Sequence, residues 1–267
     1  MKKILFTLLS MILIFSLLTG CSSKENTASS PLRVGATAGP HEQIVEKVKE
    51  IAKTKGLEVE IVSFNDYIQP NVQLYEKQLD LNSYQHTPYL DKFNKDHHMD
   101  LVKLASTVNF PMGIYSNQLK SLDELKEGDK ISLPNDPTNE ARALLLLQSA
   151  NVIKLKDTKD LNLTIKDIAE NPKNIEFIEL DAPMVAHSLE DVAVAAINTN
   201  YAMQAGFSPA DDSIFIEPKD SPWVNIIAAR PDNKDDKRIK QFIEIYQSEE
   251  MKQFIEDIFG GSVVPGF

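Results

Sequence analysis

A polar loop that runs directly into an apolar helix carries the side chains best suited to binding a ligand. In residues 134–148 (PNDPTNEARALLLLQ), Asp136 is a good N-cap and the proline after it suits the first helical position. The leucine run predicts a buried helix, yet Arg142 lies near its start, three residues after Asn139 and on the same face. A guanidinium beside free N–H groups and the positive end of the helix dipole predicts an anion site, most naturally for a carboxylate. The alternative is a structural arginine paired with Glu140 or Asp136.

The segment 79–90 (LDLNSYQHTPYL) is unusually polar and aromatic for a connection between regular elements. Tyr84, His86 and Tyr89 can each pack against an apolar group while presenting a polar tip to a ligand. The alternative is a loop whose polar groups are satisfied, with tyrosine and histidine at the margin of the core.

Asparagines follow the most apolar strand-like run, residues 192–197 (VAVAAI). A continuous apolar run of this length is typical of a central parallel strand. Asn198 and Asn200 follow it, at the edge where α/β sheets bind ligands. Arginine, asparagines and aromatics together suit a small zwitterion with an apolar tail, because they can hold its carboxylate, its ammonium and its side chain respectively.

The sequence lacks the motifs of several enzyme and metal-binding classes: the dinucleotide fingerprint, Walker A, G-x-S-x-G, H-E-x-x-H and the EF-hand loop. Its five histidines include the pair His97 and His98 in a charged patch, which is typical of a solvated face. We therefore expect no catalytic residue, no metal and no cofactor. Three alternatives stay open: an enzyme with His86 as its base, a metal-binding lipoprotein, and an adhesin or signalling lipoprotein without a small ligand.

The N-terminus predicts export and a lipid anchor. Lysines precede the apolar run 4–18, which is too short to span a membrane comfortably, and the run ends in LTGC at Cys21, the only cysteine. This pattern is typical of a bacterial lipobox, so residues 1–20 are predicted to be a signal peptide and Cys21 the lipidated residue. Residues 21–31 then form a flexible tether that holds the protein on the extracytoplasmic face of the membrane. The net charge of −11 argues against a nucleic-acid partner.

Alternating strand and helix patterns predict an α/β protein of two domains. Residues 32–36, 40–55 and 57–64 read as a strand, a helix and a strand, which is a βαβ unit with parallel strands. A break at 109–113 and a return near 221–225 divide the remainder of the chain. We expect one lobe from residues 32–110 and 225–267, and the other from residues 111–224. In each lobe, helices should flank a mostly parallel sheet.

Several motifs, taken together, resemble the methionine-binding lipoprotein family (MetQ/NlpA type). They occur in order along the mature chain as VGATAGPH (34–41), YIQPN (67–71), QHTPYL (85–90), the 134–147 stretch, AINTNYA (196–202) and VN (224–225). The resemblance implies a two-lobed fold like that of periplasmic binding proteins of type II. It also implies a monomer that closes on methionine, with L-methionine the expected form, and delivers it to the permease and ATPase of an ABC importer.

The resemblance also assigns roles to individual residues. Arg142, helped by Asn139, should hold the ligand carboxylate, and Asn200 and Asn225 should hold the backbone end of the amino acid. The pocket for the thioether should be lined by Tyr67, Tyr84, His86 and Tyr89.

Two aromatic positions depart from the family pattern. Tyr84 stands where the family often has phenylalanine, and Trp223 where it often has tyrosine. These departures leave the fine selectivity open between L- and D-methionine, the sulfoxide, another small amino acid derivative and a short methionine-containing peptide.

Overall fold

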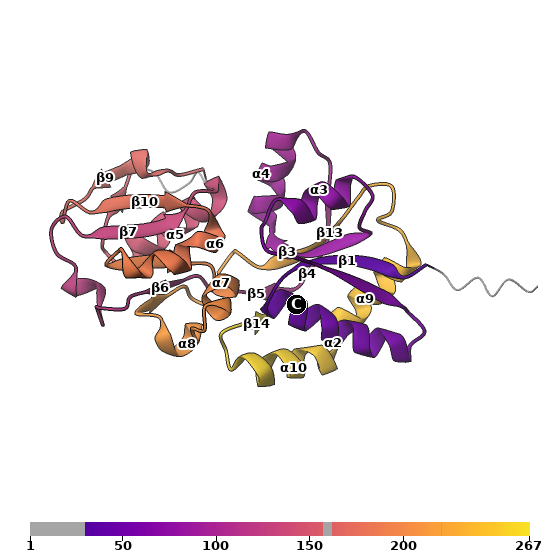
Figure 1. Cartoon of the computed structure of the whole chain (residues 1–267). Coiled ribbons are helices and arrows are strands. Elements are labelled where there is room, and N and C mark those ends of the chain that lie inside the picture. Colours follow the sequence, from indigo (N-terminus) through magenta and orange to yellow (C-terminus); the bar gives the residue numbers. More distant parts are fainter. Residues whose placement is uncertain (1–29, 157–161, 220) are drawn as a thin grey trace, which may run out of the picture. The chain divides into compact units, whose positions relative to one another are not determined.

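The computed structural model describes residues 30–156, 162–219 and 221–267 (Figure 1). The predicted signal peptide, Cys21 and the tether as far as residue 29 lie outside the described residues. The elements, in chain order, are β1 (Leu32–Thr37), α2 (Pro40–Thr54), β2 (Val59–Phe64), α3 (Gln69–Tyr75), β3 (Leu81–His86), α4 (Thr87–His97), β4 (Val102–Ser106), β5 (Val108–Asn109), β6 (Gly113–Tyr115), η1 (Leu122–Glu124), β7 (Lys130–Pro134), α5 (Pro137–Ser149), β8 (Lys154–Leu155), η2 (Ile165–Asp167), β9 (Ile168–Glu170), β10 (Glu176–Leu180), α6 (Ala182–Val185), η3 (Ala186–Glu190), β11 (Val194–Ile197), α7 (Thr199–Gln204), α8 (Pro209–Asp212), β12 (Phe215–Ile216), β13 (Asn225–Ala229), α9 (Lys237–Tyr246), α10 (Glu249–Phe259) and β14 (Val264–Pro265).

The first sheet has the strand order β2-β1-β3-β13-β4. Strands β2, β1 and β3 are parallel, as the βαβ pattern predicts, whereas β13 runs antiparallel to both β3 and β4. Because β13 comes from late in the sequence, two separate stretches of the chain build this sheet.

Helices cover both faces of the first sheet (Figure 1). Along β13, Ile227 and Ala229 belong to the core cluster that also contains residues of α2, α9 and α10. The alternate residues Ile226 and Ala228 pack on the other face, with residues of α3 and α4. The alternation of side chains along a strand thus supplies apolar residues to both faces, as a central strand requires.

The second sheet has the strand order β10-β7-β11-β6-β12, with β10, β7 and β11 parallel and β6 and β12 antiparallel to their neighbours. The apolar run predicted to be a central strand is β11. Val194 and Ala196 pack against the α5 side of the sheet, and Ala195 and Ile197 pack with residues of α6 and α7. The two-lobed α/β class therefore rests on two sheets, each with its own core.

The interpretation of residues 79–90 as a connecting segment is wrong, because they contain β3 and the start of α4. All six residues of β3 are buried. Its polar side chains are satisfied internally: Asn82 donates to Asn71 Oδ1 (2.8 Å), and Gln85 donates to the same oxygen (2.7 Å). Strand β3 is thus buried through a hydrogen-bond network rather than through an apolar pattern.

Two segments contain only short pieces of regular structure. Residues 165–170 form a single 3₁₀ turn, η2, followed by the short strand β9, which pairs with β8. Strand β12 has only two residues.

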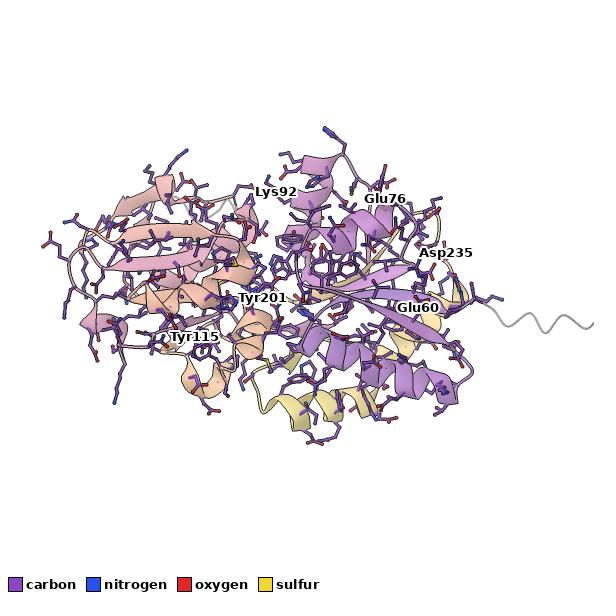
Figure 2. The ribbon with its side chains drawn as sticks, in the orientation of Figure 1. Glu60, Glu76, Lys92, Tyr115, Tyr201 and Asp235 are labelled. Atoms are coloured by element: carbon purple, nitrogen blue, oxygen red, sulfur yellow. The ribbon has the colours of Figure 1, made fainter. Side chains whose placement is uncertain are left out.

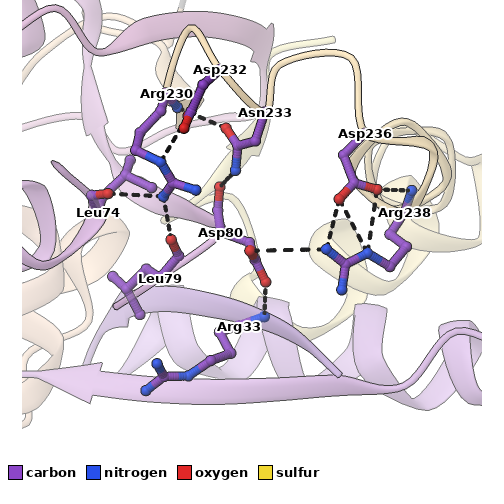
Figure 3. Close-up of polar contacts among 9 residues, drawn as sticks. All are labelled: Arg33, Leu74, Leu79, Asp80, Arg230, Asp232, Asn233, Asp236 and Arg238. Atoms are coloured by element: carbon purple, nitrogen blue, oxygen red, sulfur yellow. Dashed lines mark hydrogen bonds and ion pairs between the residues drawn. The ribbon is translucent and has the colours of Figure 1, made fainter. Parts of the chain in front are cut away.

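A buried arginine fixes the segment that follows β13 (Figure 3). Arg230 Nη1 donates to the carbonyl oxygens of Leu74 (2.9 Å) and Leu79 (2.5 Å), and Nε donates to Asp232 (3.0 Å). Leu74 lies in the last turn of α3, where a helix favours a nearby positive charge. All these contacts lie within the part of the chain that carries the first sheet, so Arg230 is a structural cation.

Candidate ligand-binding site

One cavity brings together all eight residues predicted to bind a ligand. It comprises about 340 Å³ of space between atoms, part of which is open to solvent. The predicted residues that line it are Tyr67, Tyr84, His86, Tyr89, Asn139, Arg142, Asn200 and Asn225. Five further residues line it without having been assigned to it from the sequence: His41, Gln85, Phe110, Asn198 and Thr199.

Arg142 lines this cavity but is also held in a buried ion pair. Its side chain is 3% exposed. Nε and Nη2 donate to the two carboxylate oxygens of Glu217 (2.8 and 2.6 Å), and Nη2 also donates to Phe110 O (2.7 Å). The alternative pairing with Glu140 or Asp136 is wrong, because the partner acid is 75 residues away in the sequence. Among the described residues none hydrogen-bonds Nη1, so that nitrogen is left to donate to a ligand.

The start of α5 confirms the predicted N-cap and defines the role of Asn139. Asp136 accepts a hydrogen bond from Asn139 N (3.1 Å) and two from its side-chain amide (3.0 and 2.9 Å). The Asn139 oxygen contacts His86 Nε2 (3.4 Å) and accepts from Asn198 Nδ2 (2.9 Å). Asn139 thus links the helix start to β3 and to Asn198. Burial raises the pKa of Asp136 above its ordinary value.

His86 is a neutral histidine with a defined tautomer. Its Nδ1 accepts from Tyr89 N (3.1 Å) at the start of α4, so its proton lies on Nε2, facing the Asn139 oxygen. Burial, with the nearby charge of Arg142, lowers the pKa of His86 to about 3. An imidazole with this pKa is a poor general base near neutral pH, which weakens the enzyme alternative.

Three tyrosines form a cage on one side of the cavity. The hydroxyls of Tyr84 and Tyr89 both donate to the carbonyl oxygen of Tyr67 (2.7 and 3.0 Å), and the ring centroids of the three lie 5.9–6.2 Å apart. Burial raises the pKa of all three phenols well above the ordinary value, so each ring is neutral. This cage suits an uncharged, polarisable side chain.

Two asparagines next to the cage leave buried polar atoms without a partner. The Asn200 oxygen accepts from Tyr67 OH (2.5 Å), but its amide nitrogen bonds to none of the described residues. In Asn198 the nitrogen is bonded and the oxygen is unpartnered. Buried polar groups are nearly always paired. An unpaired donor and an unpaired acceptor in one cavity therefore indicate a ligand that carries both a hydrogen-bond acceptor and a hydrogen-bond donor.

Asn225 provides a further acceptor. Its side-chain nitrogen lies 2.8 Å from His41 Nε2 and 3.3 Å from Tyr84 O. No described residue bonds its side-chain oxygen, which leaves that atom available in the cavity. Burial lowers the pKa of His41 to about 3, so this ring is neutral as well.

The site residues that were not predicted differ in how strongly the sequence indicated them. His41 belongs to one of the motifs that carry the resemblance, and Asn198 stands at the strand edge already expected to face the crevice. Glu217 had no local signal, because only the fold brings it to Arg142. Trp223, noted as a departure from the family, packs on the Arg142 guanidinium at 5.4 Å and on the His86 ring at 5.1 Å.

Metal and membrane features can be assessed for residues 30–156, 162–219 and 221–267. Within these ranges no group of three or more histidine, cysteine, aspartate or glutamate side chains could hold a metal ion. No helix in the same ranges is long and apolar enough to cross a membrane.

Comparison with known proteins gives consistent results over nearly the whole chain. The model of the family described as NlpA lipoprotein matches residues 32–267. A Salmonella typhi protein named D-methionine-binding lipoprotein MetQ is 47% identical over 253 residues, which cover 94% of this chain and 93% of the relative.

Two solved structures are similar in both sequence and fold. A nutrient binding protein from Burkholderia cenocepacia bound to methionine has a TM-score of 0.86 and 45% identity, and the match covers 88% of this chain and 100% of that one. A periplasmic substrate-binding protein of an ABC transporter from Coxiella burnetii has a TM-score of 0.85 and 43% identity, with the same coverage of each chain.

Proposed function

Since the chain belongs to the NlpA lipoprotein family, we propose that it captures free methionine between two lobes and delivers it to an ABC importer. The observation that carries this proposal is a single cavity in which an unpartnered donor and an unpartnered acceptor lie beside a tyrosine cage. The relative named for D-methionine binding and the solved structure bound to methionine support the choice of ligand.

In the proposed pose, each part of methionine has its own partners. Arg142 Nη1 and Asn200 Nδ2 donate to the carboxylate, and the side-chain oxygens of Asn198 and Asn225 accept from the ammonium. The thioether lies within the cage formed by the tyrosines and His86. Asn139 acts through its neighbours, because its amide already bonds Asp136, His86 and Asn198.

These contacts are sufficient for tight binding. Burying a methionine side chain contributes about 1.5–3 kcal/mol, and each hydrogen bond to a charged ligand group about 1.5–3 kcal/mol. Loss of ligand freedom opposes binding by about 4 kcal/mol or more. The balance is compatible with a dissociation constant between about 1 μM and 1 nM, which is about −8 to −12 kcal/mol.

The lobes of this proposal are residues 32–110 with 225–267, and residues 111–224. The chain passes between them near β5 and again between β12 and β13. Asn109 ties these two crossings together, because its side-chain nitrogen donates to Lys219 O (2.9 Å) and to Ser221 Oγ (3.1 Å). A short paired connection of this kind supports hinge closure over the ligand.

The same proposal covers the location and partners of the protein. Cys21 would carry the lipid that holds a monomer on the extracytoplasmic face of the cell membrane, beside the permease and ATPase complex. Membrane fractionation tests this: the protein should sediment with membranes and be released by detergent. A protein found entirely in the soluble fraction would contradict the anchor.

Titration calorimetry tests the proposed ligand. Protein unfolded and refolded to remove any bound ligand should bind L- or D-methionine with a dissociation constant of about 1 μM or below. Arg142→Lys keeps a cation for Glu217 but loses the donor Nη1, so its affinity should fall at least tenfold, about 1.4 kcal/mol.

The matched control for this variant is Arg230→Lys. It also alters a buried guanidinium, but outside the cavity, so it should lower the melting temperature and leave the affinity unchanged. Unaltered methionine binding by Arg142→Lys would remove Arg142 from the site.

A further inference from the structure

We propose that Glu217 restricts the cavity to zwitterionic ligands, namely free amino acids, and excludes anions of the same shape. This inference rests on the proposed function and names the determinant of its ligand class. Glu217 does not line the cavity. It acts through Arg142, whose guanidinium it holds and whose charge it compensates, and is therefore a positioning and specificity residue.

The bonding of Glu217 is complete. One carboxylate oxygen accepts from Arg142 Nε, and the other accepts from Arg142 Nη2 and from Met112 N (2.8 Å). Its side chain is 6% exposed. A two-point pair at this depth is hardly screened by water, so it cancels most of the positive charge that Arg142 would otherwise present.

Among the described residues, the other ionisable groups that line the cavity add no positive charge. His41 and His86 are buried and neutral, and the three tyrosines of the cage are neutral. Two further acids lie near the site: Asp136, which accepts from the Asn139 amide, and Asp66, whose charge acts on Tyr84 and Tyr89. Any charge on either is negative. A ligand with a carboxylate but no ammonium would lose its hydration on entering this cavity without meeting a net positive charge.

The unpartnered acceptors lead to the same conclusion. The side-chain oxygens of Asn198 and Asn225 can only accept hydrogen bonds, so they need a ligand with several donors at one atom. An ammonium group provides three. A hydroxyl in its place provides one donor and leaves a buried acceptor unpaired, which is the kind of mismatch that binding sites reject strongly.

The test compares methionine with its α-hydroxy analogue, the anion in which –OH replaces –NH₃⁺. Wild-type protein should bind the hydroxy acid at least 100-fold more weakly. In Glu217→Gln the side-chain volume and one acceptor for Arg142 remain, but the guanidinium charge is uncompensated. The preference for methionine over the hydroxy acid should therefore fall at least tenfold.

The control variant, Glu176→Gln, removes the same charge from an exposed position on β10 and should keep the wild-type preference. Hydroxy-acid binding within tenfold of methionine in the wild type would overturn the proposal. An unchanged preference in folded Glu217→Gln would also overturn it. If that variant does not fold, the wild-type ratio decides.

The same titrations separate this inference from the proposed function. A wild-type protein that binds leucine rather than methionine, and rejects the hydroxy analogue of leucine, would refute the methionine proposal and support the zwitterion rule. A protein that binds methionine and its hydroxy analogue equally would support the methionine proposal and refute the zwitterion rule. A protein that binds none of these compounds would overturn both.

Discussion

His41 gives the amide of Asn225 a single orientation. The His41 side chain is 4% exposed, and its Nδ1 lies 2.8 Å from Thr37 Oγ1. Its Nε2 lies 2.8 Å from Asn225 Nδ2. Because the ring is neutral and Asn225 Nδ2 is the donor, Nε2 accepts and Nδ1–H points to the threonine. Gly39, whose φ of 83° suits glycine, turns the chain into the helix that carries His41.

Replacing His41 should therefore weaken ligand binding through its effect on Asn225. In His41→Ala the Asn225 amide can rotate, and the loss of one hydrogen bond, about 0.5–1.5 kcal/mol, corresponds to a two- to tenfold weaker affinity in calorimetry. His41→Gln keeps an acceptor at a similar distance and should restore most of the affinity. Equal losses in both variants would show that His41 only packs.

At the residue scale, the sequence was most informative where a motif could be matched. Arg142 and Asn200 were found because local spacing and the resemblance agreed, and both line the cavity. The ion pair that orients Arg142 was not predictable, because its partner Glu217 becomes a neighbour only in the folded chain. The binding roles of the eight residues remain predictions until the variants are measured.

At the element scale, helix α5 carries a buried acid that makes the stability of the protein depend on pH. Glu140 is 4% exposed and accepts from Ile165 N (2.9 Å). Burial, with the negative charges of Glu179, Asp136 and Asp167 nearby, raises its pKa from 4.5 to about 7. The folded state therefore binds the proton more tightly than the unfolded state does.

Because the folded pKa is the higher one, this group favours folding below pH 4.5 and progressively less as the pH rises to about 7. The free energy of unfolding should fall by roughly 3 kcal/mol across that interval relative to Glu140→Gln, as measured by urea unfolding of ligand-free protein. Glu176→Gln, which removes an exposed acid, should keep the wild-type pH dependence. A wild-type curve parallel to that of Glu140→Gln would contradict the shift.

The elements that could be predicted are those that are buried through apolar side chains. The run 192–197 gave β11, and the N-cap with its leucine run gave α5. Strand β3 was missed because its buried side chains include Asn82 and Gln85, which satisfy each other and Asn71. Hydrophobic periodicity cannot detect a strand that is buried through a polar network.

At the scale of the whole molecule, hydrogen bonds outside the cavity connect the two parts of the chain that carry the two sheets. Tyr201, on α7 (labelled in Figure 2), donates to Asn65 O (3.2 Å), beyond the end of β2. Gln204, on the same helix, donates to Ala38 O (2.9 Å). These contacts connect α7, which packs on the second sheet, with the ends of two strands of the first. They should favour the closed form whether or not a ligand is bound.

Tyr201→Phe tests this closure separately from ligand contact. The Tyr201 ring packs on Tyr67 at 5.1 Å, and phenylalanine keeps that packing while it removes the hydroxyl. A closed form destabilised by one hydrogen bond, about 0.5–1.5 kcal/mol, should give a two- to tenfold weaker apparent affinity for methionine. The ligand-free protein should also have a larger radius of gyration in X-ray scattering. Tyr75→Phe, at a tyrosine that is 43% exposed, is the control and should change neither quantity. If Tyr201→Phe instead binds as the wild type does, this hydrogen bond does not contribute to closure.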